Sequence, residues 1–370
     1  VSETAAQAIN RSMAKHMAPD APLIAETGGL NAMIVDSTAL PEQAVRDIVI
    51  SSFQSAGQRC SALRVLYLQE DIVKPFMRML SGAMDELIVG HPWSHATDVG
   101  PVIDATAQAK INAHIAKARS DDRLVKQIPA PKTGTFVGPA VLRVSGIDDL
   151  EEEIFGPVLH VATYKAEEID TVVDRINASG FGLTFGMHSR IDGRIEQVIG
   201  RIKAGNIYIN RNQIGAIVGS QPFGGEGLSG TGPKAGGPNY LPRFARPARA
   251  ALAAPNGPAA SQKAVSQALA AANTQSLARL TTLALPGPTG ESNQLTEYGR
   301  GVVLCLGPDA ASARHQAQQA RDSGAIPVLV APGLSPAEGI NGVVQVEFLS
   351  ELAGFAAVAS YARDDTLGPI

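Results

Sequence analysis

The sequence is poor in cysteine, in aromatic residues and in long apolar runs. Its 370 residues include only two cysteines, Cys60 and Cys305, which cannot form a disulfide framework and favour a reducing cytoplasm. With 5% aromatic residues and a net charge of −4, the chain carries no signature of nucleic-acid or membrane-surface binding. The apolar run 301–306 is too short to cross a bilayer, and charged residues interrupt the first twenty positions, so neither a transmembrane segment nor a secretory signal peptide is expected.

Strand-like and helix-like segments alternate through most of the chain, which predicts a layered α/β fold. Expected strands lie at 23–25, 32–35, 63–68, 158–164 and 206–210. Expected helices lie at 41–55, 72–87, 105–119, 167–178 and 190–202. The glycine-rich stretch 215–237 follows a clear strand and predicts a shaped loop.

A change in composition near residue 248 predicts a second domain. Residues 248–272, rich in alanine, proline, serine and glutamine, are typical of a linker that runs into a helix. Beyond it, a strand at 302–306, a helix at 310–323 and a strand at 326–330 predict a small Rossmann-like domain. The expected boundaries are a catalytic domain at 23–230, its tail at 231–250, a linker and helix at 251–300, and a C-terminal α/β domain, possibly incomplete, at 301–370.

Cys60 and Glu26, thirty-four residues apart, can together process an aldehyde. A thiolate attacks a carbonyl carbon, and a partly desolvated carboxylate can activate water to release the resulting acyl group. Each residue also has an ordinary interpretation: a free cysteine is often a buried structural residue, and Glu26 precedes a tight glycine turn. Cys305 keeps that structural interpretation because it lies mid-strand. No histidine–cysteine spacing suggests zinc, so no metal site is expected.

The order of three motifs resembles that of the aldehyde dehydrogenase superfamily. The first motif is E-T-G-G, from Glu26 to Gly29. The second is G-Q-R-C, whose last residue is Cys60. The third is E-I-F-G-P, whose first residue, Glu153, lies ninety-three residues after Cys60. The resemblance implies an NAD-dependent dehydrogenase in which Cys60 is the nucleophile and Glu26 the general base. It also implies that Glu153 accepts hydrogen bonds from the nicotinamide ribose with Phe155 beside it. Gly28, lacking a side chain, would let the nicotinamide ring approach.

Finer matches resemble the branch that oxidises L-glutamate γ-semialdehyde, as the dehydrogenase module of bifunctional proline-utilisation flavoenzymes does. There an anchor loop binds the substrate's α-carboxylate, which implies this role for the backbone of Gly215 and Ala216. The resemblance adds the Ser61 hydroxyl as a donor and Phe223 against the aliphatic chain. Some relatives have serine where this chain has Ala216. A generic glycine-rich loop is the ordinary interpretation.

The resemblance also implies parts that this sequence does not match. Family members complete the oxyanion hole with an asparagine ahead of the glutamate motif, and they bind the cofactor's pyrophosphate upstream. Residues 1–22 are therefore interpreted as the remnant of an NAD-binding domain, in a piece of a longer polypeptide with an FAD-dependent proline dehydrogenase upstream. Expected partners are the small-molecule substrate, these upstream domains and possibly a second copy of the chain. The alternatives are an aldehyde dehydrogenase of other specificity and a non-catalytic assembly module.

Overall fold

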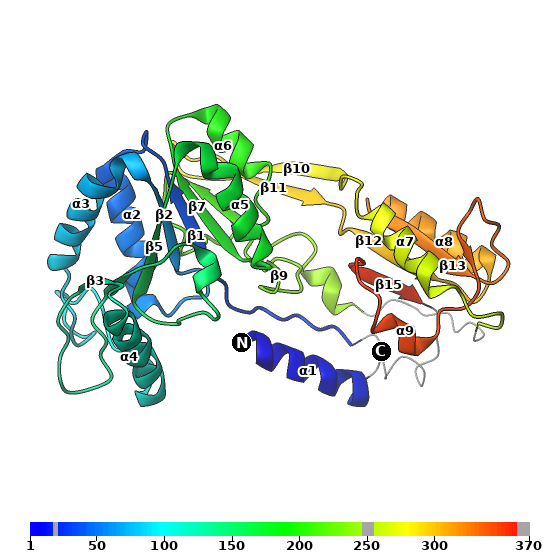
Figure 1. The fold of residues 1–370 in the computed structure, drawn as a ribbon, viewed down its shortest axis with the longest axis horizontal. Helices are drawn as coiled ribbons and strands as arrows, with labels where there is room; N and C mark the ends of the chain where they lie inside the picture. The colour runs from blue at the N-terminus through cyan, green and yellow to red at the C-terminus, as the bar shows by residue number, and fades with distance from the viewer. Residues whose placement is uncertain (18–20, 246–254, 361–370) are drawn as a thin grey trace. The chain divides into compact units, whose positions relative to one another are not determined.

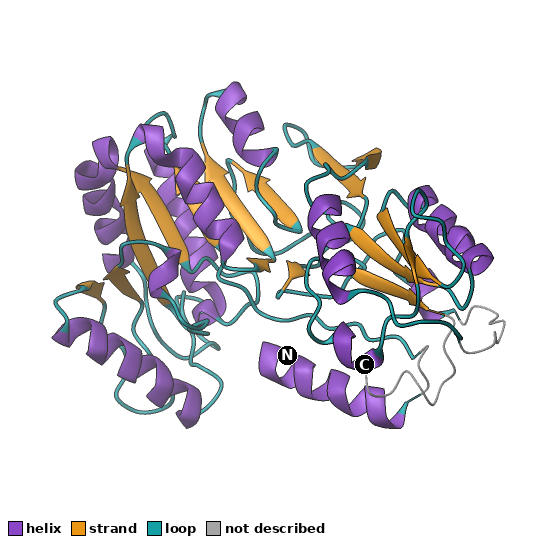
Figure 2. Cartoon of the chain, turned by 45° about the vertical axis from the view of Figure 1, so that its right-hand side comes forward, coloured by secondary structure: helices purple, strands orange, loops and turns teal. Residues whose placement is uncertain are grey.

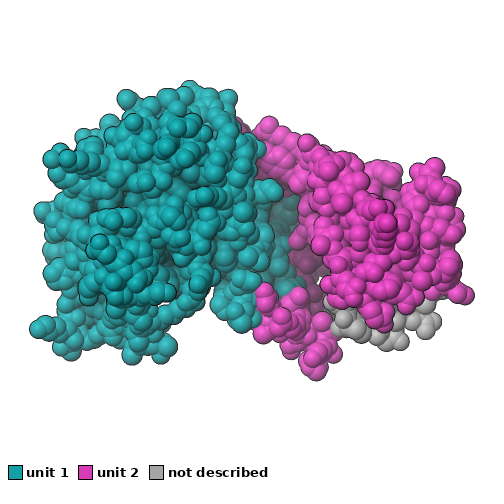
Figure 3. Space-filling model, viewed as in Figure 1, with its two compact units in different colours: residues 1–6, 23–218, 222–240 teal, residues 7–22, 219–221, 241–370 magenta. Residues whose placement is uncertain are grey.

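A computed structural model describes residues 1–17, 21–245 and 255–360, and the chain divides into two compact units (Figure 3). Unit 1 comprises residues 1–6, 23–218 and 222–240, and unit 2 comprises 7–22, 219–221 and 241–370. Parts of four predicted segments, at 18–20, 246–250, 251–254 and 361–370, lie outside the described residues. Within the described residues, no helix has the length and hydropathy needed to cross a bilayer.

Unit 1 is built on a seven-stranded sheet in the order β3-β4-β5-β2-β1-β7-β8 (Figure 1). All neighbouring strands in it are parallel except β3 and β4. The strands are β1 (Ala32–Val35), β2 (Val65–Gln69), β3 (Leu124–Gln127), β4 (Ala140–Arg143), β5 (Val158–Tyr164), β7 (Thr184–His188) and β8 (Asn206–Ile209). A two-residue pair, β6 (Phe181–Gly182) with β9 (Glu226–Gly227), lies outside it. A layered α/β fold is therefore confirmed.

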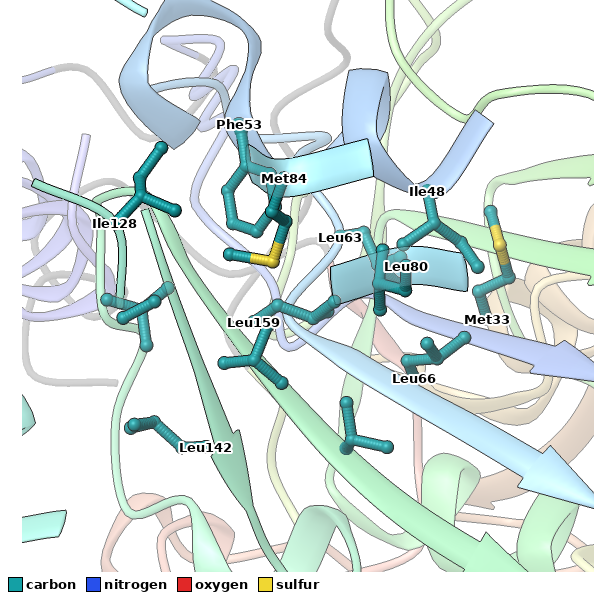
Figure 4. Packing of buried hydrophobic residues seen from close by; sticks show 14 of the residues in the cluster. Met33, Ile48, Phe53, Leu63, Leu66, Leu80, Met84, Ile128, Leu142 and Leu159 are labelled. Carbon is teal, nitrogen blue, oxygen red and sulfur yellow. The ribbon is translucent and has the colours of Figure 1, made fainter. Parts of the chain in front are cut away.

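Helices cover both faces of this sheet because its strands are apolar on both sides (Figure 2). Met33 and Val35 of β1 face one core, whereas Ala32 and Ile34 face the other. The first core receives α2 (Pro41–Phe53), α3 (Val73–Asp85) and α4 (Ala105–Ser120), and Figure 4 shows its close packing. The second core receives α5 (Ile169–Ala178) and α6 (Asp192–Ile199). The central strands β1, β2 and β7, on which the site is built, are thus fully buried.

Unit 2 contains the Rossmann-like layer that the sequence predicted. Its four-stranded parallel sheet has the order β14-β13-β12-β15. The strands are β12 (Val302–Leu306), β13 (Ile326–Ala331), β14 (Ile340–Asn341) and β15 (Ala357–Ser360). The helices are α7 (Gln262–Ala272), α8 (Ala310–Asp322) and the short α9 (Val346–Leu349). Asp309 caps α8 by accepting a hydrogen bond from the Ser312 N–H at 2.8 Å.

Two sequence predictions need correction. Residues 23–25 form no strand, and the backbone there makes only an isolated bridge between Glu26 and Gly230. Part of the expected linker, 251–300, is the antiparallel hairpin of β10 (Arg279–Leu285) and β11 (Asn293–Tyr298). Its strands are mostly exposed, so it lacks the one-sided apolar alternation that marks a strand. No secondary structure was predicted for residues 1–22, where α1 (Glu3–His16) forms; Ser2 precedes it and accepts a hydrogen bond from the Ala5 N–H.

Gly57 sharply reverses the chain between α2 and Cys60. Ser55, Ala56 and Gly57 all have positive φ, at 57°, 54° and 65°. A methyl group on Gly57 would lie 2.1 Å from the carbonyl oxygen of Gly156. Only glycine satisfies both the backbone conformation and this close approach.

We expect Gly57→Ala to lower the free energy of unfolding by more than about 1 kcal/mol, because it combines strain with a backbone clash. Gly82→Ala, inside α3 with nothing within 4 Å of the new methyl group, is the matched control. It should be neutral or stabilising by up to about 1 kcal/mol. Urea unfolding of both variants measures the difference, and equal effects would contradict the proposed role of Gly57.

Candidate active site

The predicted catalytic residues converge on one edge of the unit 1 sheet. Glu26 precedes β1, Cys60 precedes β2 and Glu153 precedes β5. Because these strands are parallel, their amino ends share an edge, so residues far apart in sequence lie close together. The site therefore lies at the amino ends of the strands, whereas ligands of open parallel sheets usually bind at the carboxyl ends.

Buried side chains that hydrogen-bond to the backbone fix the loop that carries Cys60. The amide nitrogen of Asn31 donates to the carbonyl oxygens of Cys60 (2.6 Å) and Ala62 (2.9 Å). The Thr184 hydroxyl donates to the Ser61 carbonyl at 3.2 Å, and Gln213 Nε2 reaches the same oxygen at 3.4 Å. The thiol itself remains exposed. A rigid loop thus presents an accessible nucleophile.

A buried ion pair joins the Cys60 loop to Glu153. The Arg64 guanidinium is fully buried and donates to Glu153 Oε1 from Nη2 (2.8 Å) and Nε (3.1 Å). It also donates to the carbonyl oxygens of Gly156 (3.2 Å) and Arg59 (3.1 Å). Burial raises the pKa of Glu153, and the Arg64 charge opposes that rise. The Arg64 charge therefore offsets part of the cost of burying this carboxylate.

The surroundings of Cys60 raise the pKa of its thiol above the ordinary value. Desolvation by surrounding protein atoms raises its pKa most, the charge of Glu153 raises it further, and Glu26 adds a smaller effect. The backbone N–H groups of Ser61 and Cys60 itself lower it. Since the thiolate is the reactive form, this site gains nucleophilicity when the nearby negative charge is reduced or when a base accepts the proton.

Glu26 lies in a partly desolvated position suited to a base. Its Oε1 is buried and accepts no hydrogen bond from any described residue, and burial is the main reason why its pKa is raised. The nearby Lys234 opposes this rise. Lys234 donates to the carbonyl oxygens of Gly205 and Gly224, and burial lowers its own pKa to about 8. Glu26 therefore has one oxygen without a protein donor, as a base that holds water requires.

Glu153, Phe155 and Gly28 can accept part of a dinucleotide. Glu153 Oε2 takes one hydrogen bond, from the Gly29 N–H at 3.2 Å, and its side chain is 15% exposed, so lone pairs remain for a ribose hydroxyl. Phe155 is 44% exposed and lies against the Arg64 guanidinium. A carboxylate acceptor beside an exposed aromatic ring fits the nicotinamide riboside end of NAD. The close neighbour that makes Gly28 necessary is Glu153, because a methyl group on Gly28 would lie 1.8 Å from Oε2.

Three of the expected substrate residues, Gly215, Ala216 and Phe223, follow β8 in the sequence, and the fourth, Ser61, lies next to Cys60 before β2. Gly215 has φ of 72° and is exposed, and Ala216 is half-buried. Ser61 is buried beside Cys60, and its hydroxyl makes no hydrogen bond to a described residue. Phe223 is half-buried and forms a two-bond bridge with Ala235 at 3.0 and 2.8 Å. These positions suit a carboxylate anchor.

Cys305 differs from Cys60, as its place in a strand predicted. It is fully buried in β12, and burial raises its pKa to about 11. Its sulfur has no carboxylate–base arrangement around it among the described residues. The site chemistry rests on Cys60 alone.

The family model described as "Aldehyde dehydrogenase family" matches residues 1–248. The chain belongs to the aldehyde dehydrogenase family. It is 47% identical over 335 residues to the bifunctional protein PutA of Klebsiella aerogenes, covering 80% of this chain and 26% of that protein. It is 39% identical over 224 residues to 1-pyrroline-5-carboxylate dehydrogenase of Geobacillus kaustophilus, covering 59% and 43%. The chain thus spans about a quarter of the length of the PutA relatives.

Solved structures give the same relationship. A Bradyrhizobium japonicum proline utilization A (PutA) variant matches with a TM-score of 0.64 and 54% identity, over 66% of this chain and 25% of that one. A Thermus 1-pyrroline-5-carboxylate dehydrogenase with bound NAD matches with a TM-score of 0.59 and 33% identity, over 66% and 48%. The observed α/β layers are therefore those of this family.

Sequence patterns did not predict the residues that hold the site together. Arg64 was visible only as a positive neighbour of Cys60, and nothing in its surroundings indicated full burial. Three further residues hold the Cys60 loop by hydrogen bonds to distant parts of the chain: Asn31, Thr184 and Gln213. Contacts of this kind leave no pattern in the neighbouring sequence. Lys234 lies in a glycine-rich stretch that predicted only a loop.

Glu153→Gln should shift the pH dependence of Cys60 alkylation to lower pH. Removing the negative charge that raises the thiol pKa favours the thiolate, so the iodoacetamide rate at pH 7.5 should rise roughly three- to tenfold. Glu152→Gln, at an exposed carboxylate paired with Lys110, is the matched control and should leave the rate unchanged. Peptide mapping should place the label on Cys60; an unchanged profile for Glu153→Gln would contradict this electrostatic account.

Proposed function

We propose that this chain provides the catalytic centre of an NAD-dependent L-glutamate γ-semialdehyde dehydrogenase. The single observation that carries the proposal is the convergence of Cys60, Glu26 and Glu153 at one sheet edge in a chain of the aldehyde dehydrogenase family. The similarity to PutA proteins and to 1-pyrroline-5-carboxylate dehydrogenases supports this substrate. An acyl-transfer centre on a rigid scaffold is what the oxidation of an aldehyde to an acid requires.

The chain's own residues would act in two steps. First, the Cys60 thiolate adds to the aldehyde carbon, and the loop amides that face the sulfur are placed to stabilise the developing negative charge. When bound, NAD would accept the hydride from that carbon, which leaves a thioester on Cys60. Glu26 would then remove a proton from water as its oxygen adds to the thioester carbon, and the C–S bond breaks to release the acid and leave the Cys60 thiolate. Glu153 would hold the cofactor's ribose, while Arg64 keeps that carboxylate in place.

The substrate's α-carboxylate would bind at the loop around Gly215 and Ala216, with the Ser61 hydroxyl as a further donor. Gly215 is exposed and has a φ of 72°, a conformation that glycine adopts readily, so its backbone would be accessible to a ligand. Phe223 would pack against the aliphatic part of the substrate. An aldehyde dehydrogenase of other specificity remains the second candidate, because the catalytic residues alone do not select a substrate.

We further propose that the chain functions within a longer polypeptide, as its PutA relatives suggest. Upstream domains would then supply the pyrophosphate-binding part of the NAD site and an FAD-dependent proline dehydrogenase. The predicted division into catalytic domain, tail, linker and C-terminal domain belongs to this proposal. Cytoplasmic localisation and assembly into a homo-oligomer are parts of it as well.

Glu26→Gln should separate the two steps in an assay that needs no cofactor. Mono-p-nitrophenyl glutarate acylates a thiol and releases nitrophenolate, leaving a glutaryl thioester. The variant should still release about one equivalent in a burst, whereas the steady rate should fall roughly 10²- to 10⁴-fold because only hydrolysis needs the base.

Rapid mixing with absorbance detection measures both phases. Glu167→Gln, at an exposed carboxylate in another part of unit 1, is the control and should retain both. Loss of the burst in Glu26→Gln would show that Glu26 generates the thiolate, and an unchanged steady rate would exclude it as the base.

A further inference from the structure

We propose that Arg59 is a specificity-determining residue, whose guanidinium selects substrates that carry a carboxylate at the end remote from the aldehyde. The proposal rests on the function proposed above and deepens it, because that function uses only neutral donors to bind the carboxylate. Arg59 directly precedes the nucleophile Cys60 in the sequence. A cation at this position would bind one end of a substrate whose other end reacts.

The Arg59 residue is held at both its backbone and its side chain. Its carbonyl oxygen accepts hydrogen bonds from Arg64 Nη2 at 3.1 Å and from the Ala62 N–H at 3.0 Å. Its Nε donates to the hydroxyl of Ser55 at 3.2 Å, and Ser55 itself lies in the positive-φ bend before Cys60. The side chain is half-buried, so its direction is restricted before any ligand arrives.

This direction is toward the anchor loop. A methyl group placed on Gly215 would lie 4.0 Å from Arg59 Nη1, and no other atom comes as near. Gly215 is exposed, so the space beside the guanidinium is open to a ligand. A carboxylate bound by the Gly215 and Ala216 backbone would lie within reach of the Arg59 charge. Arg59 and Ser61 therefore flank the nucleophile Cys60 in the sequence.

The Arg59 guanidinium forms no ion pair with a described residue. Among the described residues, no carboxylate lies within ion-pair distance of Arg59, whereas Arg64 is fully paired with Glu153. A guanidinium presents a planar fork of donors that matches a carboxylate in two parallel hydrogen bonds. The Nε bond to Ser55 leaves the terminal nitrogens available for this. The chemistry therefore favours a carboxylate ligand over an alcohol or an alkyl chain.

Two esters of equal acyl length test the proposal on this chain without NAD. Mono-p-nitrophenyl glutarate carries the remote carboxylate, and p-nitrophenyl pentanoate lacks it. The unchanged chain should acylate Cys60 faster with the glutarate ester. Arg59→Gln should lower the glutarate-to-pentanoate ratio of second-order acylation rates roughly 10- to 100-fold, and Arg59→Lys should restore part of it.

Arg143→Gln is the matched control, because it removes one exposed arginine charge on β4 and should leave the ratio unchanged. If Arg59→Gln lowers both rates equally, Arg59 only supports the loop and the proposal is wrong. If the ratio stays as before, Arg59 is excluded while the carboxylate anchor survives. If the unchanged chain shows no preference at all, the proposed substrate fails, and the role of Arg59 fails with it.

Discussion

The buried ion pair between Arg64 and Glu153 is the interaction on which the site depends. One guanidinium binds the Glu153 carboxylate and two backbone carbonyl oxygens, those of Arg59 and Gly156, and so ties the Cys60 loop to the segment before β5. Burying two charges costs several kcal/mol each unless geometry and extra hydrogen bonds offset it, and here all these bonds are present. The same carboxylate raises the pKa of the Cys60 thiol. The Arg64–Glu153 pair therefore affects both the position of the Cys60 loop and the reactivity of its thiol.

Glycine-dependent bends bring these groups together at an edge that parallel sheets seldom use. Gly57 lets the chain leave α2 and pass against Gly156, and Gly28 leaves space for the Glu153 carboxylate. Without side chains at these two points, the segments before β1, β2 and β5 approach within hydrogen-bonding distance. The buried sheet below is covered by helices on both faces and gives the loops a rigid base.

Local sequence patterns predicted much of the fold and the candidate reactive residues. They did not predict the buried residues that hold the reactive residues in place. Strand β5 and the β12–α8–β13 unit followed from apolar runs and turns, and Cys60 and Glu26 from motifs within a few residues. The hairpin β10–β11 was missed because its exposed side chains show no alternation. Arg64 and Asn31 could not be recognised, since their burial arises from contacts between distant segments. The close approach of Glu153 to Gly28 was not predicted either, because it joins segments far apart in the sequence.

A double-mutant cycle on the ion pair tests the central claim most directly. Arg64→Met, Glu153→Gln and the combined variant are compared with the unchanged chain by urea unfolding. The account predicts that Arg64→Met alone costs roughly 3–5 kcal/mol, because it leaves a buried carboxylate unpaired, and that the pair shows a coupling energy of at least about 2 kcal/mol. Additive effects within about 0.5 kcal/mol would contradict the claim that this pair holds the site together.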